Sequence, residues 1–265
     1  MCYDVSYNIT LESIEEYIGR DIQFDPAQME IDFDASIHVL AQAFKKGLII
    51  LNDEGQYKGK YFEWGVIANY MNTPEKVKKM RSSMCNIRSE KIPDKSSFWY
   101  RIRKNRCLVP VKGFYEHRGI KGWKSKVPYY IELKGRELFC LPGLYAYAPV
   151  PDPETGELKG TYAVITRAAN SLMRQIHNDG DNAFRMPLML PKELEMKWLD
   201  PDLSDDEIKE ILSYEMPAEE LDYRAVWTIR TTKAHPQQGR KTDAFDWPNL
   251  PPLGQDDGEL QKTMF

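Results

Sequence analysis

The close spacing of its β-rich segments most constrains how this chain can fold. Segments rich in β-branched and aromatic residues, bounded by Gly, Pro or Asn, follow one another with few residues between them. They cover residues 61–68, 106–117, 127–133, 137–147, 161–166, 186–190 and 223–231. Parallel neighbours need long crossover connections, whereas antiparallel neighbours do not. The spacing therefore predicts a curled, mainly antiparallel, barrel-like sheet.

Short helices are expected outside this sheet. Thr73 followed by Pro74 is typical of a helix start, and so is the Ser-Asp-Asp-Glu sequence at residues 204–207. The expected helices cover residues 13–20, 73–84, 169–178, 191–199 and 204–214. Together these patterns predict one α+β domain over residues 1–234. Residues 235–265, with their Pro, Gly and Gln, are expected to form a loosely ordered tail.

Several classes of protein do not fit this sequence. The N-terminus has no basic region followed by an apolar one, and the apolar run at residues 48–51 is too short to cross a bilayer, so we expect a cytoplasmic protein without membrane contact. The four cysteines form no CxxC pair and the four histidines lie far apart. We therefore expect no metal. We also expect no other cofactor and a monomeric protein.

Charge is distributed unevenly along the chain. Residues 76–126 contain sixteen Lys and Arg but only three acidic residues, although the whole chain has a net charge of −4. Aromatic residues lie among these cations, as in the Phe-Trp-Tyr sequence at residues 98–100. This composition suits a groove that neutralises phosphates and stacks bases of single-stranded nucleic acid. A solvated basic face is the alternative interpretation.

Cys2 is the first residue with an evident chemical use. Removal of Met1 would expose a residue that carries both an α-amine and a thiol. Both groups are partly deprotonated near neutral pH. An aldehyde could react with both, because the amine forms a Schiff base and the thiol closes it to a thiazolidine ring.

Four further motifs occur in a fixed order after Cys2. They are FEWGVI at residues 62–67, MCNIRSE at 84–90, RCLVPVKGFYEH at 106–117 and RMPLML at 185–190. With the Met-Cys start, this set resembles the SRAP family (SOS response-associated peptidase), whose members look for abasic sites in single-stranded DNA. The resemblance implies covalent capture of the ring-opened abasic site by Cys2.

The resemblance also implies roles for particular residues. Asn86 would orient the N-terminus and the opened sugar, Glu116 would hold or deprotonate the α-amine, and His177 would transfer protons. A carboxylate and an imidazole suit these needs, because the amine must lose a proton and the sugar oxygen must gain one. DNA contacts are expected from Arg88, Arg185, Trp64 and Tyr70.

This chain departs from the family pattern at two places. Tyr3-Asp4 replaces Gly-Arg after Cys2, which puts an acid where a phosphate contact is expected. Residues 178–184 form an insertion between His177 and the RMP motif, which could displace His177 or form a rim.

Ordinary structural roles are the alternatives for three of the site residues. Glu116 could form an ion pair with a neighbouring cation, Asn86 could cap a helix, and His177 could cap the helix expected at residues 169–178. For the whole protein, the alternatives are a cysteine-type peptidase or autopeptidase that uses Cys2, and a non-catalytic module that only binds single-stranded DNA.

Overall fold

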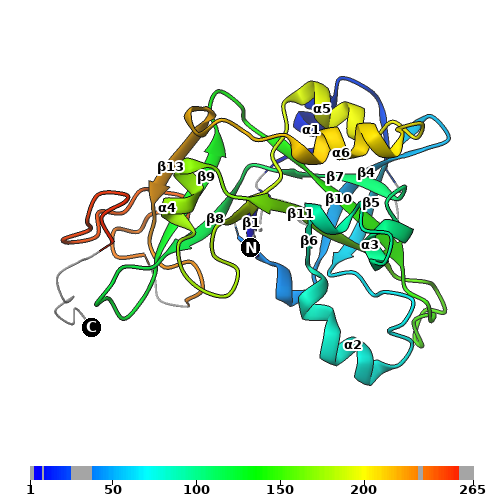
Figure 1. The fold of residues 1–265 in the computed structure, drawn as a ribbon, viewed down its shortest axis with the longest axis horizontal. Helices are drawn as coiled ribbons and strands as arrows, with labels where there is room; N and C mark the ends of the chain where they lie inside the picture. Colours follow the sequence, from blue (N-terminus) through cyan, green and yellow to red (C-terminus); the bar gives the residue numbers. More distant parts are fainter. Residues whose placement is uncertain (1–2, 8, 25–37, 232–234, 257–265) are drawn as a thin grey trace.

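The fold consists of two sheets with short helices around them (Figure 1). The structure is a computed structural model that describes residues 3–7, 9–24, 38–231 and 235–256. The smaller sheet has five strands in the order β13-β9-β8-β1-β3, and every pairing within it is antiparallel. These strands are β1 (Asp4–Ser6), β3 (Val39–Leu40), β8 (Gly113–Arg118), β9 (Val127–Leu133) and β13 (Leu221–Ala225).

The larger sheet closes on itself. Its order is β12-β11-β10-β7-β4-β5-β2, with β6 paired to β11, and an additional parallel pairing of β11 with β5 turns its central strands into a ring. Its strands are β2 (Ile22–Phe24), β4 (Lys46–Asp53), β5 (Gln56–Trp64), β6 (Asn86–Arg88), β7 (Arg106–Val111), β10 (Phe139–Tyr147), β11 (Gly160–Ala168) and β12 (Arg185–Pro187). The predicted α+β fold with a curled, mainly antiparallel sheet is confirmed.

The helices are short, and their ends follow the capping residues. Thr73 accepts a bond from the Lys76 N–H, and Ser204 forms a capping box with Glu207. The α-helices are α1 (Leu11–Ile18), α2 (Pro74–Met80), α3 (Phe98–Arg101), α4 (Ser171–Ile176), α5 (Lys192–Trp198) and α6 (Asp205–Ser213). The 3-10 helices are η3 (Ala41–Ala43), η4 (Arg81–Met84), η5 (Ser89–Lys91) and η6 (Ala218–Glu220).

Two clusters of apolar side chains hold these layers together. One cluster joins the sheets, because it contains Phe114 of the smaller sheet and Val164 of the larger one. The other joins the larger sheet to the helices above it in Figure 1, with Ile50 of β4, Trp198 of α5 and Ile211 of α6. Such burial of apolar surface is the main stabilising contribution to the fold.

The expected strand at residues 106–117 divides into two strands, β7 and β8. The break falls at Lys112, whose N–H donates to the Ser6 carbonyl of β1. A side chain at Gly113 would meet the ring of Tyr130, because an added Cβ would lie 2.4 Å from it. The chain therefore passes from the larger sheet into the smaller one, and β8 carries Glu116 beside β1.

Other boundaries also differ from the sequence predictions. The strand expected at residues 61–68 ends at Trp64, and the helix expected at 73–84 ends in the 3-10 helix η4. Strand β4 was not predicted, although it includes the apolar run at residues 48–51. Its residues are buried on both faces, so it lacks the alternation that marks a half-buried strand.

The C-terminal segment packs on the smaller sheet over its described part, residues 235–256. Trp247 is buried and stacks on Trp227, and Arg118 donates to the carbonyl oxygens of Pro251 and Pro252. These contacts hold residues 235–256 against the domain. The domain boundary at residue 234 stays a prediction.

Candidate functional site

The expected site residues meet where β1, β6, β8 and α4 come together. β1 runs antiparallel to β8, with Asp4 opposite Tyr115 and Val5 opposite Phe114. This register brings Tyr3, the residue before Asp4, toward Glu116. Cys2, the expected nucleophile, lies outside the described residues.

Glu116 is a buried carboxylate on β8. Its side chain is almost wholly removed from solvent, and this burial raises its pKa to about 7. Burial has this effect because it disfavours the charged form of the group. A carboxyl group with such a pKa can both accept and donate a proton near neutral pH.

His177 faces Glu116 from the end of α4. Its Nε2 atom lies 3.7 Å from Oε2 of Glu116, and its Nδ1 atom lies 2.8 Å from the carbonyl oxygen of Arg185. Burial lowers the pKa of His177 to about 4, so the ring is neutral at neutral pH. A neutral ring that donates from Nδ1 to a carbonyl has its lone pair on Nε2. The atom that faces Glu116 can therefore accept a proton.

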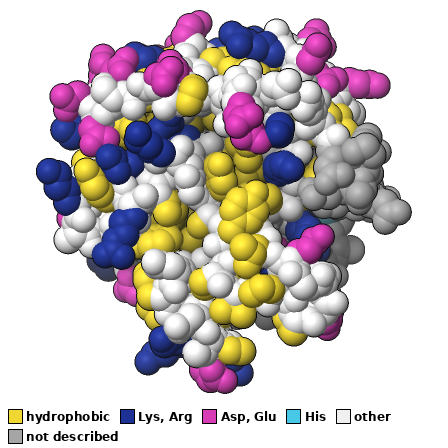
Figure 2. Space-filling view, turned by 90° about the vertical axis from the view of Figure 1, so that its right-hand side faces the viewer, with side chains coloured by type: hydrophobic (Ala, Val, Ile, Leu, Met, Phe, Trp, Pro, Cys, Tyr) yellow, Lys and Arg dark blue, Asp and Glu magenta, His cyan; other side chains and the backbone are white. Residues whose placement is uncertain are grey.

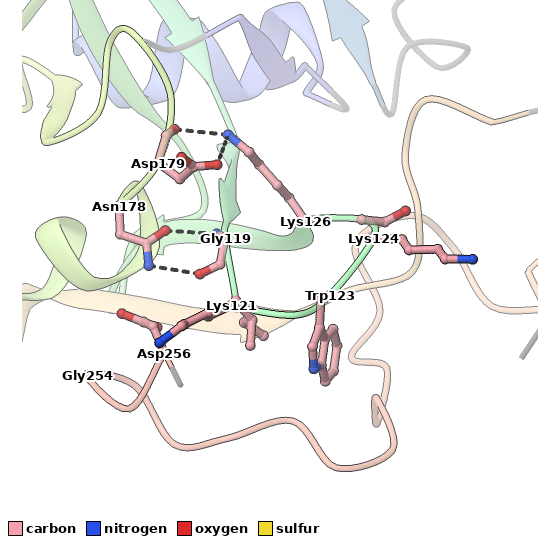
Figure 3. A pocket seen from close by; sticks show the side chains of 11 residues that line it. Gly119, Lys121, Trp123, Lys124, Lys126, Asn178, Asp179, Gly254 and Asp256 are labelled. Atoms are coloured by element: carbon pink, nitrogen blue, oxygen red, sulfur yellow. Dashed lines mark hydrogen bonds and ion pairs between the residues drawn. The ribbon is translucent and has the colours of Figure 1, made fainter. Parts of the chain in front are cut away.

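Asn178 ties His177 to the strand that carries Glu116 (Figure 3). Its amide accepts from the Gly119 N–H at 2.8 Å and donates to the Gly119 carbonyl at 2.9 Å. Asp179 then pairs with Lys126, on the far side of the hairpin between β8 and β9. The insertion at residues 178–184 therefore does not separate His177 from Glu116, and its first two residues fasten the two segments together.

Asn86 lies on β6, which runs parallel to β11 with Asn86 opposite Val164. Its side chain is 6% exposed, and among the described residues no group bonds its amide nitrogen or oxygen at good geometry, although the Tyr3 hydroxyl comes close to the amide. Buried polar groups are almost always bonded, so an unbonded amide indicates a place for a ligand group. The helix-cap alternative for Asn86 is excluded, because the residue belongs to a strand.

Tyr3 connects Asn86 with Glu116. Burial raises the pKa of Tyr3, as do the nearby Cys85 thiol and the Glu116 carboxylate, while the approach of the Asn86 amide lowers it. Tyr3 is half-buried, so its ring forms part of the site wall. The sequence showed only that Tyr3 stands where the family has glycine. No local pattern predicted that Tyr3 is a site residue.

The structure corrects the expected DNA contact of Trp64. Its side chain is 1% exposed, its Nε1 donates to the Cys85 carbonyl at 2.8 Å, and its ring stacks on Tyr162. Trp64 is a core residue that bonds the backbone of Cys85, directly before β6. It cannot contact DNA without unfolding of this region.

Arg185 is also engaged within the protein. Two of its nitrogens bond the two carboxylate oxygens of Glu90, at 2.6 and 2.9 Å, and a third bond goes to the Thr166 carbonyl. Its guanidinium therefore holds η5 against β12. Its backbone carbonyl orients the ring of His177, a contribution that the sequence did not indicate.

Two of the expected DNA contacts are on the surface. Arg88 is exposed, with one bond to Asn182 at 3.3 Å. Tyr70 is 40% exposed and packs edge-on against Phe98, with 5.8 Å between ring centroids. Both can be reached by a ligand. Their contacts with DNA stay predictions.

Comparison with known proteins now identifies the chain. A family model described as "SOS response associated peptidase (SRAP)" matches residues 1–230. The chain belongs to the SRAP family. The resemblance noted in the sequence is thereby confirmed.

Individual relatives agree with this membership. The abasic site processing protein YoqW of Bacillus subtilis (strain 168) is 31% identical over 175 residues, which are 66% of this chain and 72% of YoqW. The abasic site processing protein HMCES of Pongo abelii is 25% identical over 193 residues, covering 63% of this chain and 51% of HMCES. A crystal structure of a protein from Bacteroides thetaiotaomicron matches with a TM-score of 0.74 and 32% identity, over 85% of this chain and 92% of that one.

Several cations of the basic stretch are engaged within this SRAP protein. Arg81 pairs with Glu63, Arg103 pairs with Asp205, and Arg118 is fully buried. Part of the excess charge therefore stabilises the fold. Figure 2 shows hydrophobic side chains gathered in a central band on one face, with Lys and Arg side chains beside it.

Two further properties concern cofactors and membranes. Within the described part of the chain, no group of three or more His, Cys, Asp or Glu side chains could hold a metal ion. Among the same residues, no helix has the length and apolar character needed to span a bilayer.

Proposed function

We propose that this SRAP protein processes abasic sites in single-stranded DNA by forming a covalent cross-link through Cys2. The α-amine would add to the sugar aldehyde, and loss of one water would give a Schiff base. The thiol would then add to the imine carbon and transfer its proton to nitrogen, which closes a thiazolidine ring. Family membership and the names of the relatives support abasic-site processing, and the use of Cys2 is our inference.

The acid–base pair supports this chemistry. The attacking amine must lose a proton, and the departing water must receive one. Glu116 can do both because its pKa is raised to about 7 by burial. His177 presents a neutral Nε2 atom to Glu116 and can relay the proton.

Chain connectivity supports Cys2 as the nucleophile. Two residues of chain span at most about 7 Å, and Asp4 is fixed opposite Tyr115, next to Glu116. The α-amine of Cys2 becomes available only when Met1 has been removed. N-terminal processing is therefore a condition of the proposal.

The observation that carries the proposal is the buried amide of Asn86, which has no well-formed bond among the described residues and lies by Tyr3, as Glu116 does. A ring-opened sugar offers hydroxyl groups that can both donate to the amide oxygen and accept from the amide nitrogen. A structural polar residue at the same depth would be expected to have protein partners. Asn86 therefore suits a bound sugar or N-terminus better than a purely structural role.

A denaturing gel tests the proposal. The protein, freed of Met1, is incubated with a labelled single-stranded oligonucleotide that contains one abasic site, and in parallel with the intact oligonucleotide. We expect a band that survives denaturation with the abasic strand only, and no such band with Cys2→Ala. Binding without a covalent band would favour the non-catalytic module. Cleavage of a peptide that requires Cys2, with no DNA adduct, would favour the peptidase.

A further inference from the structure

Arg230 stands beside the site and was not among the expected residues. It lies just after β13, and its side chain is 47% exposed. Its Nε donates to Oδ1 of Asp4 at 3.0 Å, and its Nη2 donates to Oδ2 of the same carboxylate. Two parallel bonds of this kind fix the plane of a guanidinium.

Asp4 is itself firmly held. It is 2% exposed, and its Oδ1 also bonds Nε2 of His38 at 2.6 Å. Burial alone would raise its pKa, but the bonds from His38 and Arg230 outweigh burial and hold the pKa below its ordinary value. The acid at position 4 is therefore buried and paired, and it presents no free negative charge to a ligand.

The loop that carries Arg230 is fastened on its other side. Ile229 is buried, and its carbonyl oxygen accepts from Nζ of Lys241 at 2.8 Å. The same Nζ lies 3.3 Å from Nδ1 of His38. Arg230 and Lys241 together carry two positive charges against the single negative charge of Asp4, so this cluster keeps an excess positive charge.

The charge of Arg230 reaches the site. It lowers the pKa of Glu116 and the pKa of Tyr3, although burial dominates both shifts in the opposite direction. A guanidinium has five N–H donors, and Asp4 uses two of those of Arg230. The other three have no partner among the described residues, and half of the side chain is open to solvent.

We propose that Arg230 binds a backbone phosphate of the DNA strand next to the abasic site, and that Asp4 positions its guanidinium for this contact. The proposal rests on the function proposed above. Arg230 would approach from the side of the smaller sheet, whereas Arg88 belongs to β6 of the larger sheet. A DNA strand that crosses the site would then meet a guanidinium on each side of the abasic residue.

The salt dependence of DNA binding tests this assignment. Affinity is measured by fluorescence anisotropy with a single-stranded oligonucleotide that carries a tetrahydrofuran, an abasic analogue without an aldehyde, at several KCl concentrations. One lost phosphate contact on a single strand lowers the slope of log affinity against log salt by about 0.7. We expect this change in Arg230→Gln, with a roughly fivefold loss of affinity at 0.1 M salt, which follows from the same slope. Arg230→Lys should recover part of the slope.

Arg103 provides a matched control, because it forms the same two-bond pair with Asp205 between the turn after α3 and the start of α6. Arg103→Gln should leave the slope unchanged. Asp4→Asn tests positioning: it removes a negative charge, yet we expect weaker binding because the guanidinium is no longer fixed. Stronger binding of Asp4→Asn would overturn the positioning role.

An unchanged slope in both Arg230 variants would overturn the phosphate contact. Thermal melting of each variant ensures that binding is compared among folded proteins. If the wild-type protein gives no adduct with the aldehyde-bearing strand, the proposed function fails. If it gives the adduct and only the slope of Arg230→Gln is unaltered, the assignment of Arg230 alone fails.

Discussion

Nε2 of His177 lies 3.7 Å from Oε2 of Glu116, and both side chains are buried. Glu116 comes from the smaller sheet and His177 from the end of α4, which packs near β8 and β12. Burial raises the pKa of the carboxyl group to about 7 and lowers that of the imidazole to about 4. Burial thus favours the uncharged form of both groups. Near neutral pH the carboxyl group of Glu116 can therefore exchange a proton beside an imidazole that is not protonated, which suits the proton transfers of imine formation.

Replacing Glu116 by Gln should slow cross-linking without unfolding the protein. The amide keeps the volume of the side chain but cannot accept a proton from the amine, so we expect a loss of roughly 10² to 10⁴ in rate. The measurement is the single-turnover rate of adduct formation with abasic single-stranded DNA.

The pH dependence of the same reaction gives a second measurement. The wild-type rate should rise as Glu116 ionises near its pKa of about 7. In Glu116→Gln the rise should move toward the ordinary pKa of an α-amine, about 8. A variant with full activity at neutral pH would remove Glu116 from the mechanism.

Asn178→Ala should release His177 from the strand of Glu116. Two hydrogen bonds to Gly119 are lost, which should lower the free energy of unfolding by about 1 to 3 kcal/mol. Cross-linking should slow, while affinity for an unreactive abasic strand stays within a few fold. Asn52→Ala is the control, because Asn52 makes a similar bond to Gly55 in the turn between β4 and β5. Equal rates in the two variants would show that the Asn178 bonds do not position His177.

Trp64→Phe should affect stability and leave DNA binding alone. The change removes the bond from Nε1 to the Cys85 carbonyl and part of the stacking on Tyr162. We expect a loss of about 1 to 3 kcal/mol in the free energy of unfolding, measured by denaturant titration. The slope of affinity against salt should not change. A weakened affinity in a fully folded variant would restore Trp64 as a DNA contact.

Glu195 should make stability depend on pH independently of the site. It is buried, accepts from the Tyr17 hydroxyl and the Cys140 N–H, and burial raises its pKa to about 7. The pKa of Glu195 is about 7 in the folded state and about 4.5 in the unfolded state, so its protonation stabilises the fold. This stabilisation is fully present below pH 4.5 and is lost as the pH rises through 7.

Denaturant titrations at pH 5 and pH 8 test this pH dependence. Glu195→Gln should remove up to about 3 kcal/mol of the difference between the two pH values. Glu116→Gln is the companion variant, because burial raises the pKa of Glu116 in the same direction. The same pH dependence in Glu195→Gln and in the wild type would contradict the raised pKa.

The sequence predicted the parts of the site that lie in local motifs. Asn86 and Glu116 belong to ordered motifs, His177 lies at the end of the helix before the RMP motif, and the close strand spacing predicted the curled antiparallel sheet. Trp64 was placed wrongly because a motif does not show which face of a strand is buried. The family resemblance suggested a DNA contact there, while the structure uses the ring in the core.

Long-range contacts explain what the sequence could not predict. Arg230 and Asp4 are separated by 226 positions, and no pattern near either residue indicates their pairing. The acid at position 4 suggested a phosphate grip that is weaker or supplied from elsewhere, and in the fold this acid bonds a guanidinium beside the site. Similarly, the insertion after His177 suggested displacement, but Asn178 bonds the hairpin after Glu116.

The mass of the DNA–protein adduct tests the central claim most directly. The adduct formed with an abasic single strand, without any reducing agent, is digested, and the peptide that carries the nucleotide is identified by tandem mass spectrometry. Our account predicts the abasic nucleotide on the N-terminal Cys2, with a total mass of peptide plus abasic nucleotide less one water, and none in Cys2→Ala. A stable adduct on a lysine, or the same adduct in Cys2→Ala, would contradict it.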